Sequence, residues 1–250
     1  MEKIESKDNA KIKLLRKLGQ KKYRDELALF VVENLKTIQD AGSAPKMLFG
    51  TDKKLLEKLE AREKYLISGE INKSFSSLDT PSGVAAVYPI FLSSRASEAS
   101  RGISHFDMGK NIVYLNGISD PGNIGTILRT ALAFDIKNIV VDEDCADIHN
   151  PKAIQAAKDS IFKLNIAKDK NFKFLKEIKK KMPVISARLL GGKGPEKFKN
   201  KKVCIVLGSE SHGVDKRIQK ISNDFIKIKI SKDMESLNVA IAAGIIFYSI

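Results

Sequence analysis

Residues 116–131, N-G-I-S-D-P-G-N-I-G-T-I-L-R-T-A, decide the fold of this 250-residue chain. They follow an apolar run at 111–115 that predicts a buried strand, and they lead into an apolar helical pattern over 122–134. Pro121 and the glycines around it favour a tight turn between the two. The stretch therefore predicts a strand, a loop and a helix in direct succession.

The same alternation continues to the carboxyl end of the chain. Further strands are predicted at 138–142, 183–187, 203–207 and 225–230, and further helices at 151–160, 172–181, 214–221 and 236–250. Short apolar strands that alternate with helices are typical of a parallel sheet covered on both faces. Such sheets bind ligands beyond the carboxyl ends of their strands, so the loops after residues 115, 207 and 230 are expected to carry the chemistry.

The amino-terminal part predicts a separate small α/β module over 1–89. Strands are expected at 29–33, 46–50, 64–67 and 84–88, with helices at 9–18, 34–41, 52–62 and 71–78. The serine-rich stretch 90–110 has little periodicity and is interpreted as a linker, so that the second domain covers 111–250. The alternative is an irregular surface loop within one domain.

Composition limits the kind of protein. A net charge of +14, from 44 basic and 30 acidic residues, favours a nucleic-acid partner, although a diffuse lysine-rich surface is the alternative. Two cysteines are too few for a disulfide framework or a zinc ribbon, and the three histidines lack metal-ligand spacing, so no metal is expected. We find no signal peptide and no apolar run long enough for a membrane span, and therefore expect a cytoplasmic protein.

The first loop offers two polar side chains to a ligand. Asn123 and Arg129 lie six residues apart, and both are expected on the same side of the loop and its helix. The amino-terminal amides of that helix are suited to an anion. The alternative is that Asn123 caps the helix and Arg129 is only a surface cation.

The second loop is V-L-G-S-E-S-H-G-V, residues 206–214. Gly208 permits close approach of a ligand to the backbone, and Glu210 offers a carboxylate at the end of the strand. The stretch is no P-loop, because Val214 and Asp215 stand where Lys and Ser or Thr are required. His212 is interpreted as an ordinary loop histidine.

The third loop lies within residues 228–244. Ser236 is expected to cap the last helix, which places Leu237 and Asn238 in its first turn. Small residues follow, and they permit another helix to pack closely. No G-x-G-x-x-G occurs in the chain, so a dinucleotide site of the ordinary kind is not supported.

Taken together and in this order, the three loops resemble the SpoU family of RNA ribose 2′-O-methyltransferases, in the SPOUT class. The matching motifs are D-P-G-N-I-G-T-I-L-R-T-A, V-L-G-S-E-S-H-G-V and M-E-S-L-N-V-A-I-A-A-G. The amino-terminal module is similar to the ribosomal-protein-like substrate-binding domain of such enzymes, in the less specific segments F-V-V-E-N and T-P-S-G-V-A-A-V-Y.

The resemblance implies a carboxyl-terminal domain with a deep trefoil knot and a homodimer with sites near the subunit interface. It also implies S-adenosylmethionine as cofactor and a ribose 2′-hydroxyl of RNA as substrate. By motif position, the cofactor-binding residues are Leu207, Gly208, Ile228 and Leu237. The polar residues carried over as catalytic are Arg129, Asn123, Glu210, Ser236 and Asn238.

Two questions stay open at this point. Arg129 either takes the proton of the hydroxyl or clamps the neighbouring phosphate, and a guanidinium is almost never neutral. Gln155 stands where the family commonly has an arginine, which puts the RNA target in doubt. Ribosomal RNA is favoured over transfer RNA by the amino-terminal module. The alternatives are a knotted RNA-binding protein without catalysis, in ribosome assembly or resistance, and an enzyme that methylates a base.

Overall fold

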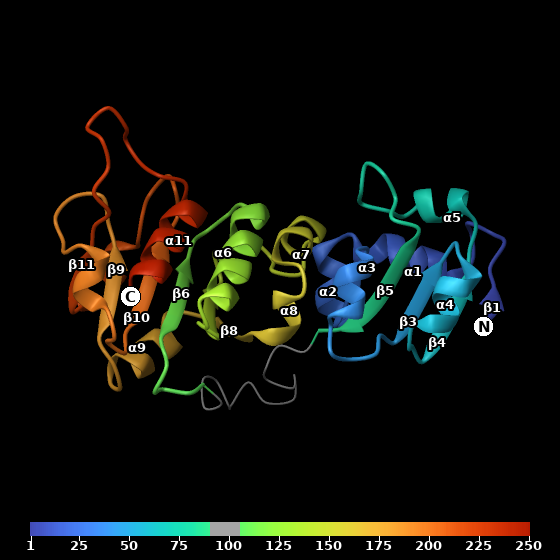
Figure 1. Ribbon diagram of the computed structural model, residues 1–250, viewed down its shortest axis with the longest axis horizontal. Coiled ribbons are helices and arrows are strands. Elements are labelled where there is room, and N and C mark those ends of the chain that lie inside the picture. The colour runs from blue at the N-terminus through green and yellow to red at the C-terminus, as the bar shows by residue number, and fades with distance from the viewer. Residues whose placement is uncertain (91–105) are drawn as a thin grey trace. The chain divides into compact units, whose positions relative to one another are not determined.

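Residues 1–90 and 106–250 are described by the computed structural model, and their internal contacts divide them into two units (Figure 1). The amino-terminal unit consists of Met1–Ile90 together with Asp147–Phe162. The carboxyl-terminal unit consists of the described residues 106–146 and of Lys163–Ile250. Most of the predicted linker, 91–105, lies outside the described residues, whereas Phe106 is already buried in the core of the carboxyl-terminal unit.

The carboxyl-terminal unit is built on a six-stranded sheet in the order β11-β9-β10-β6-β7-β8, and every pairing in it is parallel. The strands are β6 (Ile112–Asn116), β7 (Asn138–Asp142), β8 (Asn165–Asp169), β9 (Val184–Ala187), β10 (Cys204–Gly208) and β11 (Asp224–Ile226). All residues of β6 and β7 are buried, as expected for strands covered on both faces. The predicted parallel sheet is confirmed.

Helices cover this sheet on both faces. They are α6 (Pro121–Ala133), α9 (Lys173–Lys179), α10 (Lys216–Ile221) and α11 (Val239–Ser249), with a 3-10 turn η1 (Pro195–Phe198). The short α8 (Ser160–Lys163) lies at the boundary between the two units in the chain. The last helix, α11, packs against α6 and contacts β10 (Figure 1). The chain therefore returns from the edge strand β11 to the middle of the sheet. The trefoil knot itself stays a prediction.

Local details differ from expectation, most clearly at β8, β11 and the start of α11, and the helix predicted at 151–160 ends at Ala157. Strand β8 was not predicted, because its segment N-I-A-K-D mixes polar and apolar residues too closely to give a buried-strand pattern. Strand β11 ends at Ile226 instead of continuing to 230. Helix α11 begins at Val239 with Asn238 as its N-cap, whose Oδ1 accepts from the backbone N–H of Ala240 at 2.9 Å. The predicted cap at Ser236 is therefore wrong.

The amino-terminal unit has a mixed five-stranded sheet in the order β1-β4-β3-β5-β2. Its strands are β1 (Glu2–Lys3), β2 (Leu29–Val32), β3 (Met47–Gly50), β4 (Glu63–Leu66) and β5 (Val84–Pro89). Its helices are α1 (Ala10–Leu18), α2 (Lys21–Leu27), α3 (Leu35–Gln39), α4 (Lys53–Lys58), α5 (Gly69–Lys73) and α7 (Pro151–Ala157). The expected α/β module is present, with β1 and α2 as additional elements, but the helix predicted at 71–78 covers Gly69–Lys73 and the one predicted at 52–62 ends at Lys58.

A segment from the second half of the sequence, Asp147–Phe162, completes the core of the amino-terminal unit. Ile154 of α7 is buried in the same hydrophobic cluster as Phe30 and Tyr88. The Phe162 ring lies 4.7 Å from the Tyr88 ring, centroid to centroid. The chain thus leaves the parallel sheet after β7, contributes a helix to the other unit, and returns for β8.

An ion pair that is almost fully buried fixes the start of this segment. Arg24 of α2 is 2% exposed, and its Nε and Nη2 donate to Asp147 Oδ2 at 2.9 and 2.7 Å. Its Nη1 donates to the carbonyl of Leu18 at 2.8 Å. Burial alone would raise the pKa of Asp147, but hydrogen bonds from the His149 backbone and from Arg24 outweigh it, and the pKa is lowered.

We expect Arg24→Met to lower the unfolding free energy of the amino-terminal unit by about 3–5 kcal/mol, because it leaves a buried carboxylate without its partner. Hydrogen exchange measures this, with the slow amides of the six-stranded sheet as internal control. Since the pKa of Asp147 is lowered in the folded state, the contribution is present at neutral pH and is lost as the pH falls through that pKa.

The matched control is Lys53→Met. Lys53 is exposed, and its Nζ lies 3.9 Å from Glu57 Oε1. Loss of this surface ion pair is expected to change the unfolding free energy by less than about 0.5 kcal/mol. Equal effects of the two substitutions would contradict the importance of the buried pair.

Candidate active site

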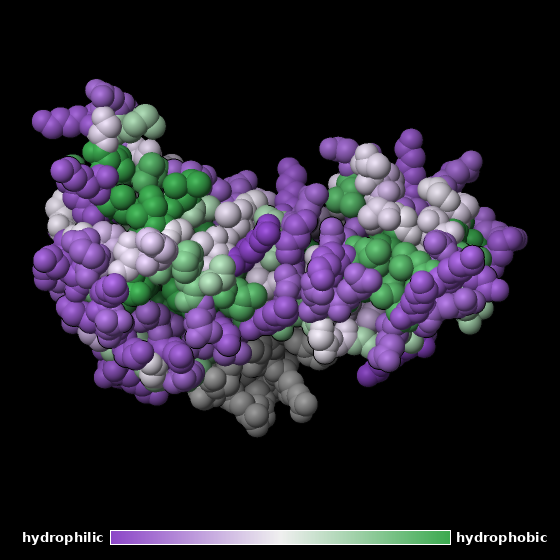
Figure 2. Space-filling view, viewed as in Figure 1, coloured by the Kyte–Doolittle hydropathy of each residue, from purple (hydrophilic) through white to green (hydrophobic). Residues whose placement is uncertain are grey.

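A cavity of about 480 Å³ lies at the carboxyl ends of β9, β10 and β11. All four residues predicted to bind the cofactor line it, namely Leu207, Gly208, Ile228 and Leu237. Two of the predicted catalytic residues, Glu210 and Ser236, also line it. Figure 2 shows hydrophobic surface gathered in this region, below the loop that follows β11. The volume and the mainly apolar walls are those of a small-molecule site.

Two asparagine side chains and one glutamate side chain connect the three predicted loops by hydrogen bonds. Asn238 Nδ2 donates to Asn123 Oδ1 at 2.9 Å, and Asn123 Nδ2 donates in turn to Glu210 Oε1. Asn238 precedes α11, Asn123 lies in the first turn of α6, and Glu210 follows β10. This chain of hydrogen bonds joins segments that are far apart in the sequence, and it lies beside the cavity wall that Glu210 forms.

The alternative that Asn123 caps the helix is wrong, because another residue caps α6. Asp120 is the N-cap of α6, and its Oδ1 accepts from the backbone N–H of Asn123 at 2.7 Å. The Asn123 side chain is therefore not needed for capping and is used between the loops.

Arg129 is not part of the hydrogen-bonded chain. It lies six residues beyond Asn123, about 9 Å along α6. Its side chain is exposed, does not line the cavity, and its guanidinium has no hydrogen bond or ion pair within the described part of the chain. It therefore remains available to a ligand, and its catalytic function stays a prediction.

Gly208 has a structural reason for being glycine in addition to the expected contact with a ligand. A Cβ at this position would collide with backbone atoms of Gly213 and Val214. Ser209 and Gly213 pair across the loop, with backbone N–H to carbonyl distances of 3.2 and 2.9 Å. Glycine is required here because the chain's own loop approaches the end of β10, and the binding of a cofactor at Gly208 stays a prediction.

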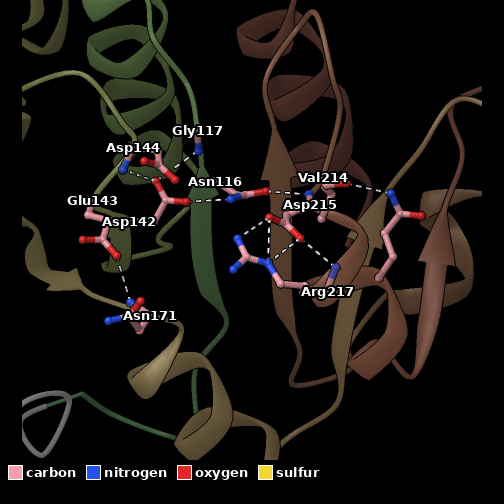
Figure 3. Close-up of polar contacts among 10 residues, drawn as sticks. Asn116, Gly117, Asp142, Glu143, Asp144, Asn171, Val214, Asp215 and Arg217 are labelled. Carbon is pink, nitrogen blue, oxygen red and sulfur yellow. Dashed lines mark hydrogen bonds and ion pairs between the residues drawn. The ribbon is translucent and has the colours of Figure 1, made fainter.

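Behind the cavity, a polar network that the sequence did not single out holds the ends of the strands (Figure 3). Asn116 ends β6 and donates to Asp142, which ends β7. Asp215 forms an ion pair with Arg217, whose guanidinium lies 4.6 Å from the Phe172 ring centroid. The hydrogen bond from Arg217 lowers the pKa of Asp215. The signal available in the sequence was a polar residue at the end of each buried strand.

Among the described residues, no helix is long and apolar enough to cross a membrane. The same residues contain no cluster of histidine, cysteine, aspartate or glutamate side chains suited to a metal ion. His212 is exposed in the second loop, and its backbone N–H donates to Ser209 Oγ at 3.1 Å.

The class that the fold defines is a parallel α/β domain with a cavity formed by loops at its carboxyl edge, where sheets of this kind bind ligands. Residues 110–248 match the SpoU rRNA Methylase family, and residues 9–86 match the MRM3-like substrate binding domain. The chain belongs to the SpoU rRNA methylase family. The predicted class, an RNA methyltransferase that uses S-adenosylmethionine, is confirmed at this level.

Two named relatives are similar in sequence over most of the chain. It is 26% identical over 259 residues to the 23S rRNA (guanosine(2553)-2′-O)-methyltransferase RlmP of Bacillus subtilis, covering 99% of this chain and 98% of the relative. It is 27% identical over 195 residues to the 23S rRNA (adenosine(1067)-2′-O)-methyltransferase of Streptomyces laurentii, covering 76% of this chain and 69% of that one.

The fold is also found in solved structures. An rRNA methyltransferase from Sinorhizobium meliloti is similar with a TM-score of 0.83 and 25% identity, covering 99% of this chain and 96% of that one. An AdoMet-bound rRNA methyltransferase from the same organism has the same fold, with a TM-score of 0.84, 24% identity and the same coverage.

We expect Gly208→Ala to weaken binding of S-adenosylmethionine at least about tenfold, because the new methyl group displaces the loop that forms one cavity wall. Isothermal titration calorimetry measures this. Gly69→Ala is the control, since a Cβ at Gly69 meets no atom within 4 Å, and it is expected to leave binding unchanged. Wild-type affinity in Gly208→Ala would show that the loop position does not matter to the cofactor.

Proposed function

We propose that this chain transfers a methyl group from S-adenosylmethionine to a ribose 2′-hydroxyl of ribosomal RNA of the 23S type. The observation that carries the proposal is the cavity beside the hydrogen-bonded chain Asn238–Asn123–Glu210, which brings all three loops of the family motifs together. Its named relatives methylate 2′-oxygens of 23S rRNA, and the amino-terminal module matches a substrate-binding domain. A ribosomal RNA substrate favours a cytoplasmic location.

The cavity residues suit the chemical groups of this cofactor. Leu207, Ile228 and Leu237 offer apolar walls to the adenine ring, while Glu210 and Ser236 offer polar atoms at the same cavity. When bound, the cofactor supplies a methyl group that is already electrophilic on its sulfonium. The protein therefore needs mainly to align a ribose oxygen with that methyl group.

The remaining task is to manage charge and the proton on the ribose hydroxyl. Arg129 is the exposed cation on α6, and its guanidinium suits a bidentate contact with the phosphate beside the target ribose. In this position it stabilises negative charge on the attacking oxygen while water takes the proton. Because a guanidinium keeps its own proton at neutral pH, we assign Arg129 the phosphate clamp rather than the general base.

The departure at Gln155 does not touch this machinery. Gln155 is exposed on α7, which packs in the amino-terminal unit, and it does not line the cavity. The substitution therefore bears on which RNA is bound, and it gives no support to a protein without catalysis.

The proposal is tested with labelled S-adenosylmethionine, purified protein and total RNA from cells that lack this gene. We expect label in the ribose of one ribosomal RNA. Arg129→Ala is expected to abolish turnover and to leave cofactor affinity near that of the wild type, because the residue lies outside the cavity. Lys137→Ala removes another exposed cation of the same unit and serves as control.

Label in a base would contradict the proposed reaction, and label in transfer RNA would contradict the proposed substrate. An Arg129→Ala variant that keeps most of its turnover would overturn the phosphate clamp. If the wild type bound no cofactor and transferred no label, the non-catalytic RNA-binding alternative would replace the proposal.

We also propose that the protein is a homodimer formed through α6 and α11. Ile241, Ile245 and Tyr248 of α11 are 57%, 38% and 79% exposed. The Tyr248 ring lies 6.1 Å from that of Phe134, which follows α6 and is itself 41% exposed. A group of large exposed apolar side chains on two packed helices is typical of a subunit interface.

Ile241→Glu is expected to convert the dimer into a monomer, since it places a charge in the apolar face, and sedimentation equilibrium measures the mass. Leu27→Glu, at an apolar side chain of the amino-terminal unit that is 41% exposed, is the control and is expected to remain dimeric. A wild-type protein that sediments as a monomer would refute the proposed dimer.

A further inference from the structure

Asn116 connects two segments of the carboxyl-terminal unit through the two ends of its amide. It is 6% exposed. Its Nδ2 donates to Asp142 Oδ2 at 2.6 Å, and its Oδ1 accepts from the backbone N–H of Asp215 at 2.8 Å. Figure 3 shows its side chain stretched between these two partners. The position therefore uses a donor and an acceptor at the same time.

Asp142 acts only as an acceptor. Its Oδ2 takes the hydrogen bond from Asn116, and its Oδ1 accepts from the backbone N–H groups of Gly117 and Asp144 at 3.0 and 3.2 Å. It is also 6% exposed. A carboxylate suits this place because three donors point at it and no acceptor does. The surrounding backbone groups therefore require an acceptor at position 142 and a side chain at position 116 that donates to it and also accepts from Asp215.

The partners of the pair belong to the two segments that carry the candidate site. Gly117 starts the loop that leads to Asn123, and Asp215 directly follows the cavity wall of residues 208–214. Asp215 also caps α10, since its Oδ1 accepts from the backbone N–H of Arg217 at 2.7 Å. The carbonyl of Val214 accepts from Gln219 Nε2 at 2.6 Å. The bond from Asn116 therefore joins the start of α10 to the end of β6, in addition to the contact of Glu210 with Asn123 on the outer side of the same loop.

We propose that the Asn116–Asp142 pair positions the β10–α10 loop against the β6–α6 loop, and that cofactor binding depends on this position. The inference rests on the function proposed above for the cavity. Neither residue lines the cavity, so both are positioning residues rather than catalytic ones.

The fixed polarity gives a sharp test. Asn116→Asp sets two buried carboxylates against each other. Asp142→Asn leaves donors facing each other in either orientation of the new amide. If its oxygen faces the Asn116 nitrogen, its own nitrogen faces the backbone N–H groups of Gly117 and Asp144. If its oxygen faces those groups, its nitrogen faces the Asn116 nitrogen. The double variant N116D/D142N restores every bond. The new amide at 142 donates to the new carboxylate at 116, which still accepts from Asp215, and its oxygen accepts from Gly117 and Asp144.

The experiment measures the dissociation constant for S-adenosylmethionine by calorimetry and the hydrogen-exchange rates of the Gly117 and Asp215 amides. Each single variant is expected to bind about tenfold to a hundredfold more weakly and to exchange faster at both amides, because buried groups are left unpaired. The double variant is expected to return to within about threefold of wild-type affinity, with slow exchange restored.

Asn138→Asp is the matched control for loss of stability alone. Asn138 is a buried asparagine at the opposite end of β7, where its Nδ2 donates to the carbonyl of Asp107 at 3.0 Å. This variant is expected to lower the melting temperature and to leave cofactor affinity unchanged.

Two results would overturn the inference: single variants that bind and exchange like the wild type, or a double variant that is as weak as the singles. If the single variants do not fold, the double variant decides, because it folds and binds only if the pair acts as described. A wild-type protein without cofactor affinity would refute the proposed function instead. The exchange rates of Gly117 and Asp215 would then still test the coupling of the two loops.

Discussion

The carboxyl ends of parallel strands lie at one edge of a sheet, and the candidate site depends on this constraint. Three loops that are distant in the sequence emerge there, and a single chain of amide and carboxylate groups, Asn238–Asn123–Glu210, connects them. Asn238 has two tasks in it, because its oxygen caps α11 while its nitrogen reaches Asn123. The start of the last helix and the geometry of the site are therefore set by the same side chain, and neither can shift alone.

Apolar groups predominate in the cavity, and polar groups connect the loops that form it. The cavity is lined by leucine, isoleucine and valine residues and by the loop after Gly208, and the hydrogen-bonded chain meets it at Glu210. The Asn116–Asp142 pair lies further back, buried at the ends of β6 and β7. An apolar cavity favours a flat ring and leaves orientation to a few polar atoms at its margin. Buried amides are useful behind it because their hydrogen bonds have direction, which apolar packing lacks.

Local sequence patterns were sufficient for the class of fold and for the three loops, since short apolar strands, glycines and helix starts are local signals. They failed where the deciding contact is distant. Nothing near Asp147 indicates that its segment packs with Arg24, 123 residues away in the chain, and so joins the amino-terminal unit. Strand β8 was not predicted because its polar side chains find hydrogen-bond partners only in the folded sheet. For example, Asn165 Nδ2 donates to Asn138 Oδ1 of β7 at 3.1 Å. Asn116 was not singled out either, because the polar residue at the end of its strand is a signal that does not name its partners, Asp142 and Asp215, which lie 26 and 99 residues away.

Gln155 lies in a segment that belongs to the family domain by sequence but packs in the amino-terminal unit. The family match over 110–248 is continuous, yet residues 147–162 within it pack with the amino-terminal unit and not with the parallel sheet. The exposed residues of α7, Lys152 and Gln155 among them, are thus carried by the unit that matches a substrate-binding domain. Substitutions at the exposed positions of α7 change the surface of that unit, because neither Lys152 nor Gln155 lines the cavity. The departure at Gln155 therefore lies in a different unit from the three loops that carry the family motifs.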